Sequence, residues 1–219
     1  MSIITCIEDL RVLAQQRVPR MFYDYADSGS WTESTYRANN SDFAKIKFRQ
    51  RVAVNLENRS LASTMVGQAV SMPVALSPTG LTGMQHADGE ILAAQAAERF
   101  GVPFTLSTMS ICSIEDVAAN TTKPFWFQLY VMKDREFINR LIDRAKAAKC
   151  GALVLTLDLQ VLGQRHKDLR NGLSAPPKLT IANILNMATK PRWVAGMLGT
   201  KRRGFGNIVG HATSVSDMS

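Results

Sequence analysis

Cysteine and histidine are scarce in this sequence, and neither occurs in a pattern that builds a site. The three cysteines, Cys6, Cys112 and Cys150, are far apart and form no C-x-x-C pair. An odd number of scattered cysteines argues against a disulfide framework and against a zinc site. We therefore predict that the protein binds no metal. Free cysteines also favour a reducing compartment, and the expected location is the cytoplasm.

A long apolar segment is absent from the N-terminal region. Glu8, Asp9 and Arg11 come before any such run, which argues against a signal peptide or a membrane-spanning helix there, and we expect the mature protein to begin close to Met1. With 46% hydrophobic and 20% charged residues, the chain of 219 residues is expected to bury a core and not to be disordered.

Acidic residues are nearly absent from the C-terminal part of the chain. Six basic residues and one acidic residue follow residue 175, so most of the net charge of +8 belongs to this segment. A basic segment can attract nucleic acid, but no recognised binding module or row of interleaved aromatic residues accompanies it. No nucleic-acid partner is predicted.

What is present begins with a helical N-terminal segment, which we assign to residues 1–72. Apolar residues recur at helical spacing over 7–18. A second helical stretch follows Pro19 and ends at Ser28-Gly29-Ser30, where small residues favour a turn. These helices are expected to lead into the main body of the protein.

From residue 73 onward, a short apolar run, a turn and an amphipathic stretch repeat along the chain. The predicted strands span 73–78, 103–107, 125–130 and 152–158, and the predicted helices span 88–100, 113–119 and 134–149. Almost continuous apolar runs are typical of strands buried on both faces, so we predict a parallel sheet with helices outside it. The repeat favours either a (β/α)8 barrel or a doubly wound sheet. The absence of G-x-G-x-x-G after the first strand weakens the dinucleotide-binding form of the doubly wound sheet.

The predicted strands are half of the number that a barrel needs. We assign residues 73–158 to the first half of such a barrel. No fifth strand is predicted in residues 159–219, which contain repeated glycines and the basic cluster and are assigned to a loop and a basic segment. Half a barrel would leave two strand edges open, so we expect the chain to be incomplete.

Polar residues stand where the predicted strands end. They are Ser77, Pro78, Thr79 and Gly80 at the first strand, Ser107 and Thr108 at the second, Gln128 and Tyr130 at the third, and Thr156 and Asp158 at the fourth. Barrel strands carry their ligand at these ends, and a flat cofactor needs neutral donors and acceptors there, with glycine where backbone approaches closely. Taken singly, Ser107 and Thr156 more often satisfy local backbone groups, whereas an amide such as Gln128 inside an apolar run needs partners.

Six motifs resemble, in order and spacing, the FMN-dependent α-hydroxy-acid dehydrogenases and oxidases, the family of cytochrome-linked L-lactate dehydrogenase, glycolate oxidase and mandelate dehydrogenase. They begin at Tyr23, Ser77, Leu106, Phe127, Leu155 and Gly163, and read YDYAxSG, SPTG, LST, FQLY, LTLD and GQRHKDLRNG. Each motif alone is weak, but six in register cover essentially the whole chain. The resemblance implies a TIM barrel of the FMN-linked type, truncated to roughly the first four strands plus the N-terminal helices.

The resemblance also implies roles for individual residues. Those that would contact the flavin are Pro78, Thr79 and Gly80 at its ring and Ser107, Gln128 and Thr156 at its polar edge. Tyr25 and Arg165 match residues that hold the substrate carboxylate, and a guanidinium can bind both of its oxygens at once. Tyr130 matches a catalytic phenol beside the substrate oxygen, where it can stabilise developing charge.

The implied reaction is the FMN-dependent oxidation of an L-2-hydroxy acid, with L-lactate as the expected substrate and a quinone or cytochrome as the electron acceptor. Gly80 and Met109 stand where glycolate oxidase has an alanine and a bulky aromatic residue. Both differences are more similar to the bacterial dehydrogenases and argue against oxygen as the acceptor. The full-length form is expected to be a homo-oligomer.

Part of the family's machinery does not occur in the sequence. The fifth-strand lysine, the Ser-Asn-His-Gly-Gly-Arg segment that supplies the base, and the glycine and arginine pairs that hold the FMN phosphate are all absent. The histidines His86, His166 and His211 stand in other contexts. We therefore expect this chain to be inactive alone. The alternative is a non-catalytic fragment or subunit that pairs with a separate C-terminal half.

Residues 179–209 are predicted to dock on an anionic membrane surface, at the cytoplasmic face of the inner membrane, as the similar segment does in membrane-bound relatives. The apolar residues at helical spacing are Leu179, Ile181, Ile184, Leu185 and Met187; Trp193 suits an interface; and Lys190, Arg192 and Lys201-Arg202-Arg203 suit anionic head groups. The competing interpretation is a solvated, disordered loop, because Pro191 and several glycines interrupt a long helix.

Overall fold

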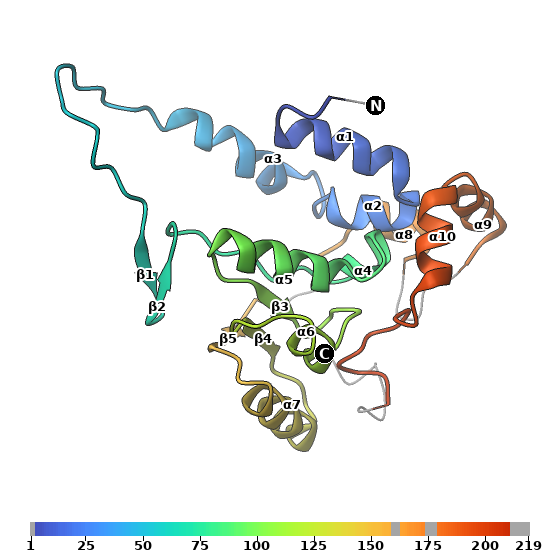
Figure 1. Ribbon diagram of the computed structural model, residues 1–219. Helices are drawn as coiled ribbons and strands as arrows, with labels where there is room; N and C mark the ends of the chain where they lie inside the picture. The colour runs from blue at the N-terminus through green and yellow to red at the C-terminus, as the bar shows by residue number, and fades with distance from the viewer. Residues whose placement is uncertain (1–2, 159–162, 174–178, 211–219) are drawn as a thin grey trace.

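The computed structural model describes residues 3–158, 163–173 and 179–210. Its helices are α1 (Ile7–Arg17), α2 (Arg20–Ala26), α3 (Ser34–Ser41), the 3-10 helix η1 (Phe43–Lys45), α4 (Thr82–Gln85), α5 (Gly89–Phe100), α6 (Ile114–Ala118), α7 (Arg135–Ala147), α8 (His166–Asn171), α9 (Ile181–Ala188) and α10 (Pro191–Gly199). Its strands are β1 (Ser63–Met65), β2 (Gln68–Val70), β3 (Thr105–Ser107), β4 (Trp126–Tyr130) and β5 (Ala152–Thr156). In Figure 1 the N-terminal helices lie above α4 and α5, and the sheet lies below them with α7 at the bottom.

The centre of the molecule is a three-stranded parallel sheet in the order β3-β4-β5. Its register pairs Ser107 with Gln128, and Tyr130 with Thr156. Because paired residues, and residues two apart on one strand, point to the same side of a sheet, these four side chains share one face. The face carries polar groups at its C-terminal end.

The opposite face of the sheet is covered by α5, α6 and α7, as the apolar runs predicted. Leu106 and Phe127 of the strands belong to one core with Ile91 of α5, Ile114 of α6 and Leu141 of α7. Full burial of a side chain of this kind contributes about 1.5–3 kcal/mol. This core therefore fixes the strand ends relative to the helices.

The predicted strand 73–78 is the one predicted element of the barrel that does not form fully. Within the described residues, Leu76 makes a single parallel bridge to Phe104. The run lies next to β3, but its other side has no ladder among the described residues, and an isolated bridge is too short to count as a strand. The remaining predicted strands and helices are confirmed with shifts of one or two residues at their ends.

β5 is an edge strand whose outer face is uncovered within the described residues. Leu153 and Leu155 pair with the buried Phe127 and Leu129, yet they are 47% and 52% exposed. The described part of the sheet does not close into a barrel. This arrangement agrees with the prediction of a barrel's first half.

Residues 159–219 contain more regular structure than the sequence indicated. The described parts include α8, α9 and α10. Helix α9 lies where apolar residues recur at helical spacing, and the competing interpretation of 179–209 as a disordered loop does not hold for α9 and α10. Pro191 separates α9 from α10 and begins α10, a position where its missing N–H costs nothing. Pro176 and Pro177, His211 and the last residues lie outside the described residues. No helix in the described part of the chain is long and apolar enough to cross a bilayer.

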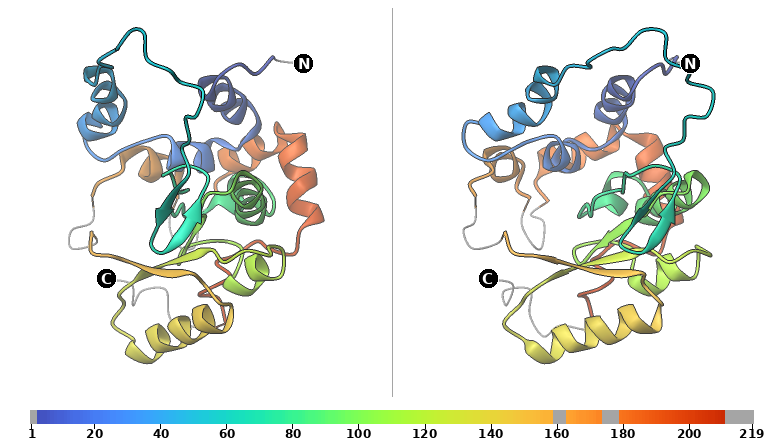
Figure 2. Two further views of the ribbon diagram at one scale, coloured as in Figure 1. Left: turned by 60° about the vertical axis from the view of Figure 1, so that its left-hand side comes forward. Right: turned by 90° about the vertical axis from the view of Figure 1, so that its left-hand side faces the viewer.

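The C-terminal helices pack against α2 in a second core above the sheet. Phe22 of α2 stacks on Trp193 of α10 with ring centroids 5.8 Å apart, and the indole N–H donates to the Met84 carbonyl at 2.7 Å. Met187 of α9 packs against the same cluster. Figure 2 shows α9 and α10 alongside α2 in both views. Trp193 and Met187, which were expected at a membrane surface, are therefore half-buried against this second core.

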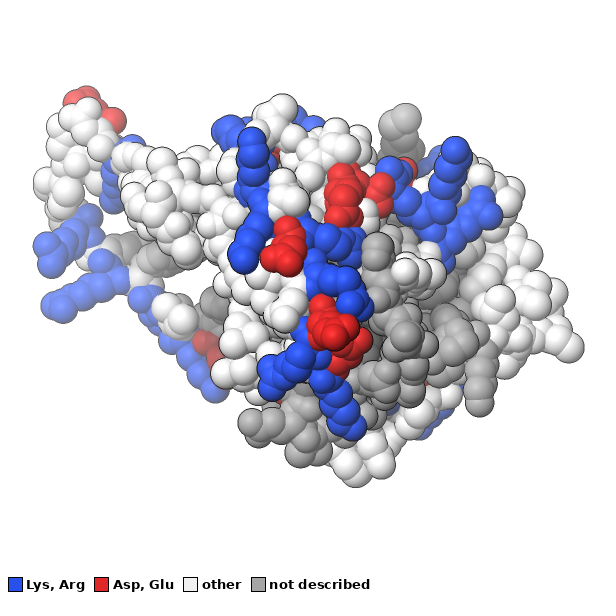
Figure 3. Space-filling model, turned by 90° about the horizontal axis from the view of Figure 1, so that it is seen from below, with Lys and Arg blue, Asp and Glu red and all other residues white. Residues whose placement is uncertain are grey.

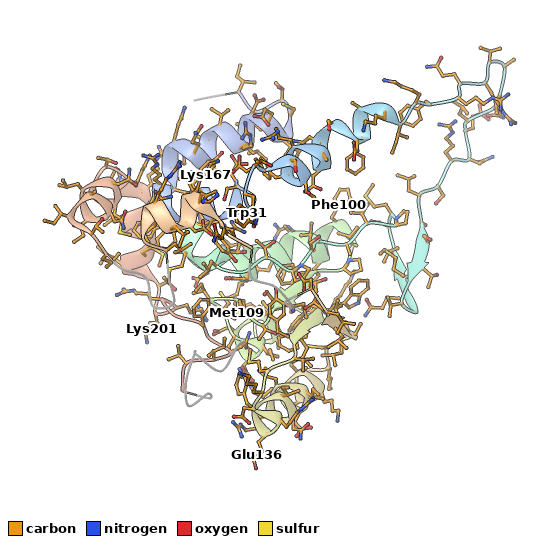
Figure 4. All side chains as sticks on the ribbon, turned by 180° about the vertical axis from the view of Figure 1, so that it is seen from behind. Trp31, Phe100, Met109, Glu136, Lys167 and Lys201 are labelled. Carbon is orange, nitrogen blue, oxygen red and sulfur yellow. The ribbon has the colours of Figure 1, made fainter. Side chains whose placement is uncertain are left out.

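Two of the basic residues predicted to meet anionic head groups are instead bound within the protein. Lys190 Nζ donates to the Gln16 carbonyl at 2.6 Å. Arg202 pairs with Asp88 at 3.0 Å and with Asp116 at 2.8 Å. Lys201 is exposed, and Figure 4 shows it at the periphery of the molecule. The basic character of this segment thus serves partly to attach it to the rest of the fold.

Residues 46–62, which we call the arm, run in an extended path away from the body and return to it through β1 (Figure 1). Phe48 and Val52 in the arm are 97% and 91% exposed. Figure 3 shows basic side chains along the arm, whereas acidic and basic side chains alternate across the middle of the same view. The basic residues of the arm and its base are Lys45, Lys47, Arg49, Arg51 and Arg59.

The hairpin β1–β2 covers the N-terminal end of the sheet strands. Gln68 Oε1 accepts a hydrogen bond from Trp126 Nε1 at 2.9 Å. A cavity of about 290 Å³ lies next to the hairpin and is lined by Gln68, Glu98, Lys123 and Phe125, among others. In barrels of this type the ligand site lies at the other end of the strands. The cavity therefore takes no part in the candidate site.

Candidate active site

The candidate site is built on a buried amide at the C-terminal ends of β3, β4 and β5. Gln128 is 1% exposed, and its Oε1 accepts from the Ser107 hydroxyl and from the Thr108 backbone N–H, each at 3.2 Å. Its Nε2 donates to Thr156 Oγ1 at 2.8 Å. The three residues predicted to meet a flavin edge thus form one connected network.

Thr108 is a member of this network that sequence reasoning did not assign. Its side chain is completely buried; Oγ1 donates to the Gln128 carbonyl at 2.6 Å and accepts from the Tyr130 N–H at 3.3 Å. These bonds join β3 to β4 beyond the last ladder pair. Its position directly after Ser107 at a strand end was the available signal.

Tyr130 and Tyr25 stand beside this network. Burial raises the pKa of the Tyr130 phenol, and the charge of Asp158 and the nearby Tyr25 add to the effect. Burial likewise raises the pKa of Tyr25, although the neighbouring Arg165 opposes the rise. Because both pKa values lie above the usual range for tyrosine, both phenols keep their protons at neutral pH and can donate hydrogen bonds.

Arg165 lies against Tyr25, so the two residues predicted to hold a carboxylate are brought together. Its guanidinium carbon lies 4.8 Å from the centre of the Tyr25 ring, and the group also bonds to the Tyr25 carbonyl. Asp168 holds Arg165 in place through an ion pair of 2.6 Å. Asp168 was not predicted, because the sequence places it in a charged run that reads as a solvated loop.

Asp168 itself is buried, which raises the pKa of its carboxyl, while the Arg165 guanidinium lowers it. The pair lies at the N-terminus of α8, where a negative charge is favourable. Arg165 is therefore oriented from one side by Asp168. The other side of its guanidinium faces the Tyr25 ring.

Gly80 is the point where the backbone after the 73–78 run approaches Tyr25. A β-carbon at this position would lie 3.1 Å from the Tyr25 hydroxyl and 3.5 Å from Met109 Cβ. The following residue, Leu81, has a left-handed backbone with φ of 59°, and its N–H donates to the Met109 carbonyl at 3.1 Å. Figure 4 shows Met109 near the centre of the molecule. Gly80 is thus set between Tyr25 and the turn that follows β3.

Pro78 and Thr79 lead into this point and are less tightly held. Pro78 is half-buried and Thr79 is exposed, with Thr79 Oγ1 donating to the Ser77 carbonyl at 3.4 Å. The structure therefore brings Tyr25, Gly80, Tyr130 and Arg165 close to the buried Gln128 network.

Comparisons with known proteins place this geometry in a family. A profile described as FMN-dependent dehydrogenase matches residues 14–218. An L-lactate dehydrogenase of Pseudomonas syringae pv. syringae is 44% identical over 220 residues, which cover 98% of this chain and 57% of the relative. The chain therefore spans little more than half the length of this curated relative.

Solved structures agree with the sequence comparison. The monotopic membrane protein (S)-mandelate dehydrogenase superposes with a TM-score of 0.89 at 33% identity, covering 99% of this chain and 58% of that chain. A soluble mutant of the membrane-associated (S)-mandelate dehydrogenase from Pseudomonas putida gives a TM-score of 0.74 at 36% identity, covering 91% and 57%. The predicted fold, the first half of such a barrel, is confirmed. This chain belongs to the FMN-dependent dehydrogenase family.

Proposed function

We propose that this chain supplies the first half of an enzyme that oxidises an L-2-hydroxy acid to the 2-keto acid with FMN. The observation that carries the proposal is the joining of Ser107, Gln128 and Thr156 into one network, with Tyr130 beside it, at the C-terminal ends of parallel strands. L-lactate is the expected substrate, in keeping with the relative named above. A quinone or cytochrome is the expected electron acceptor.

The residues present fit a flavin. Its pyrimidine edge needs neutral donors and acceptors, and the network offers two hydroxyls and an amide without any charge. The amide nitrogen of Gln128 carries two N–H groups, of which Thr156 accepts one. Glycine at position 80 lets the backbone pass close to Tyr25 and Met109, because a β-carbon there would be crowded by both residues.

Each polar residue of this half-site then has a distinct task. Arg165, held by Asp168, and the Tyr25 phenol bind the substrate carboxylate and so orient the hydroxyl-bearing carbon. Tyr130, whose phenol keeps its proton, donates to the substrate oxygen and stabilises charge that grows there. FMN, when bound, accepts the two electrons that leave the substrate. The base that takes the substrate proton is not among the residues of this sequence.

Complementation tests the proposed function. We would co-express this chain with the C-terminal part of the Pseudomonas syringae relative, purify the complex, and measure dye reduction with L-lactate. D-lactate serves as the stereochemical control and Tyr130→Phe as the site control. A complex that retains FMN but reduces the dye equally well with both enantiomers, or equally well after Tyr130→Phe, would contradict the assignment.

We further propose that the enzyme is peripheral at the cytoplasmic face of the inner membrane and docks through α9 and α10. Its apolar docking face differs from the residues predicted from the sequence, because Met187 and Trp193 pack against the second core. The exposed apolar side chains of this face are Leu179, Ile181, Ile184, Leu185 and Leu198. Arg192 and Lys201 are exposed beside them, and each can contribute about 1 kcal/mol at an anionic surface.

Vesicle co-sedimentation tests this docking. We expect the chain to bind anionic vesicles more tightly than neutral ones, and Ile181→Ser with Leu185→Ser to weaken binding by about tenfold or more, since each buried leucine or isoleucine contributes about 1.5–3 kcal/mol. Leu92→Ser on α5, at a leucine that is also exposed, is the matched control. Point variants are preferable to removing 179–209, because residues near 208 belong to the core. Unchanged binding by the double variant would exclude this face as the anchor.

A second candidate function is that of a subunit that pairs with a separate C-terminal half. The exposed outer face of β5, with Leu153 and Leu155, favours it, because uncovered apolar sheet faces are usually covered by another element. In the complementation experiment, co-purification of the two halves without turnover would support this candidate over the enzyme.

A further inference from the structure

Asn207 is a completely buried polar residue that the proposed chemistry does not use. It lies after α10, a hundred residues beyond the turn that follows β3. All of its polar side-chain atoms have partners, and these partners belong to β3, the turn after it, α6 and α7. A side chain so placed connects the C-terminal segment to the strand end that carries Ser107.

The two ends of the Asn207 amide have different partners. Oδ1 accepts from the Ile114 N–H at 3.0 Å and from Arg144 at 3.2 Å. Nδ2 donates to the Ser110 hydroxyl at 3.0 Å and lies 3.4 Å from the Ser107 carbonyl oxygen, to which it also donates. The amide oxygen thus accepts hydrogen bonds from α6 and α7, and the amide nitrogen donates to β3 and the turn after it.

The turn held by Nδ2 is the one that faces the flavin edge in the proposed function. Ser110 N–H donates to the Ser107 carbonyl at 3.2 Å, and Met109 N–H donates to the Ser107 hydroxyl at 3.1 Å. That same hydroxyl donates to Gln128. A shift of the Ser107 carbonyl would therefore change both the turn and the network around the Gln128 amide.

The backbone around Asn207 is fitted closely to this turn. A β-carbon on Gly206 would lie 2.7 Å from the Ile111 carbonyl oxygen and 2.7 Å from the Ser113 nitrogen, both of which are backbone atoms. Gly206 N–H donates to the Ser110 carbonyl at 3.2 Å. Ile208 on the other side is 2% exposed and belongs to the main core. Asn207 is therefore held in place from both sides.

A second tether precedes it. Thr200 Oγ1 and Arg202 both bond to Asp88, at 2.8 Å and 3.0 Å, and Arg202 also pairs with Asp116. Asp88 precedes α5 and Asp116 is in the first turn of α6, so this part of the segment spans two helix starts. The stretch from Thr200 to Ile208 is thus fixed at several points to the sheet's outer layer.

We propose that Asn207 is a positioning residue that sets the turn from Ser107 to Ser110, and through it the flavin-facing network of Gln128. The inference rests on the proposed function for its consequence, but the placement of the turn can be measured without FMN. Its task is done by the amide nitrogen. The amide oxygen and Arg144 have the separate task of joining the segment to α6 and α7.

This division allows a matched pair of variants. Asn207→Asp keeps an acceptor for Ile114 and Arg144 but removes the donor to Ser107 and Ser110. Arg144→Met removes the contacts on the other side and leaves the donor intact. Asn207→Ser, a smaller change without the added charge, serves if the aspartate variant does not fold. Amide hydrogen exchange in the complete chain reports the turn directly through the N–H groups of Met109 and Ser110.

We expect Asn207→Asp, or Asn207→Ser, to speed exchange at Met109 and Ser110 by about tenfold, the effect of losing one or two hydrogen bonds. Arg144→Met should change the exchange rates at these two positions less than threefold, whereas it should change the exchange rate of the Ile114 N–H. In the complemented complex, Asn207→Asp should raise the FMN dissociation constant about tenfold and shift the visible absorption of bound FMN. Arg144→Met should leave that spectrum unchanged.

The outcomes separate this inference from the proposed function. Equal exchange at Met109 and Ser110 in wild type and Asn207→Asp, or equal effects of Asn207→Asp and Arg144→Met, would overturn the positioning role. Faster exchange in Asn207→Asp together with no FMN binding by the wild-type complex would support the role of Asn207 in the turn and contradict the flavin function.

Discussion

The buried amide of Gln128 permits a quantitative test of the site's role in stability. Replacing it by leucine keeps the approximate volume and removes every polar contact of the side chain. Three partners lose a bond: the Ser107 hydroxyl, the Thr108 N–H and the Thr156 hydroxyl. They are not equally affected, because the Ser107 hydroxyl can rotate to another acceptor and the Thr156 hydroxyl only loses a donor, whereas the Thr108 backbone N–H cannot rotate.

The expected cost follows from counting the groups left without a partner. Thr156 Oγ1 loses the hydrogen bond that it accepts from Gln128, but its hydroxyl still donates to the Leu129 carbonyl at 3.5 Å. Ser107 Oγ keeps the hydrogen bond from Met109 N–H. The Thr108 N–H is left buried and unpaired, which costs about 1–3 kcal/mol. The added apolar burial of leucine offsets part of this cost. We therefore expect the free energy of unfolding to fall by an amount in the lower half of that range.

The assay is urea unfolding of the complete chain followed by circular dichroism. With a slope of about 2 kcal/mol per molar urea, the midpoint should fall by about 0.5–1 M. Gln95→Leu is the matched control, because Gln95 is partly exposed and its amide makes one bond, to the Asn120 carbonyl; it should change the midpoint little. Equal midpoints for the two variants, or a Gln128→Leu variant more stable than the wild type, would refute the role of the Gln128 hydrogen bonds in stability.

Three further predictions concern catalysis and pH. The chain alone should give no L-lactate-dependent dye reduction, and measurable turnover would contradict the need for residues outside it. In the complemented complex, Tyr130→Phe should lower kcat by about 10²-fold with little effect on KM. Arg165→Met should mainly raise KM, by about tenfold or more, because the substrate carboxylate is charged throughout the reaction. Steady-state kinetics with the reverse pattern would contradict both assigned roles. Arg144 bonds to Glu115 and lowers the pKa of that carboxyl from 4.5 to about 2, so Glu115→Gln should destabilise the chain above pH 4.5, and the difference should disappear as the pH falls toward 2. A difference in unfolding free energy that grows with acid would show that the pair is not stabilising.

Much of the sheet could be predicted because its strands are nearly continuous apolar runs. The runs at 125–130 and 152–158 became β4 and β5. The helices predicted from 113 and 134 begin after Ser113 and Asp134, whose side chains accept from the Asp116 and Phe137 N–H groups. The run at 73–78 has equal apolar character but lacks a full ladder. Strand formation depends on a partner, and a partner is a property of the fold that local sequence does not contain.

The residues of the candidate site also differ in how far the local sequence indicates them. Ser107, Gln128 and Thr156 stand out in the sequence as polar residues in or at the end of apolar runs, and their expected role at a flavin came from the resemblance to the family. Asp168 and Asn207 could not be predicted, because both stand in polar or glycine-rich stretches and gain their roles from residues far away in the chain. Trp193 was expected at a membrane surface and is half-buried against α2. Its amphipathic character suits a bilayer interface as well as it suits the surface of α2.

The arm is the segment of this chain that we expect proteases to cut first. Over residues 46–62 it makes only local hydrogen bonds among the described residues, and it carries Arg49, Arg51 and Arg59 in an extended, accessible path. Proteases bind their substrates in extended form, so a trypsin-like enzyme should cut here well before it reaches the arginines of α5 or α7. Because cleavage needs the arm uncovered, the rate of this first cut in a crude extract would report whether another polypeptide lies over it.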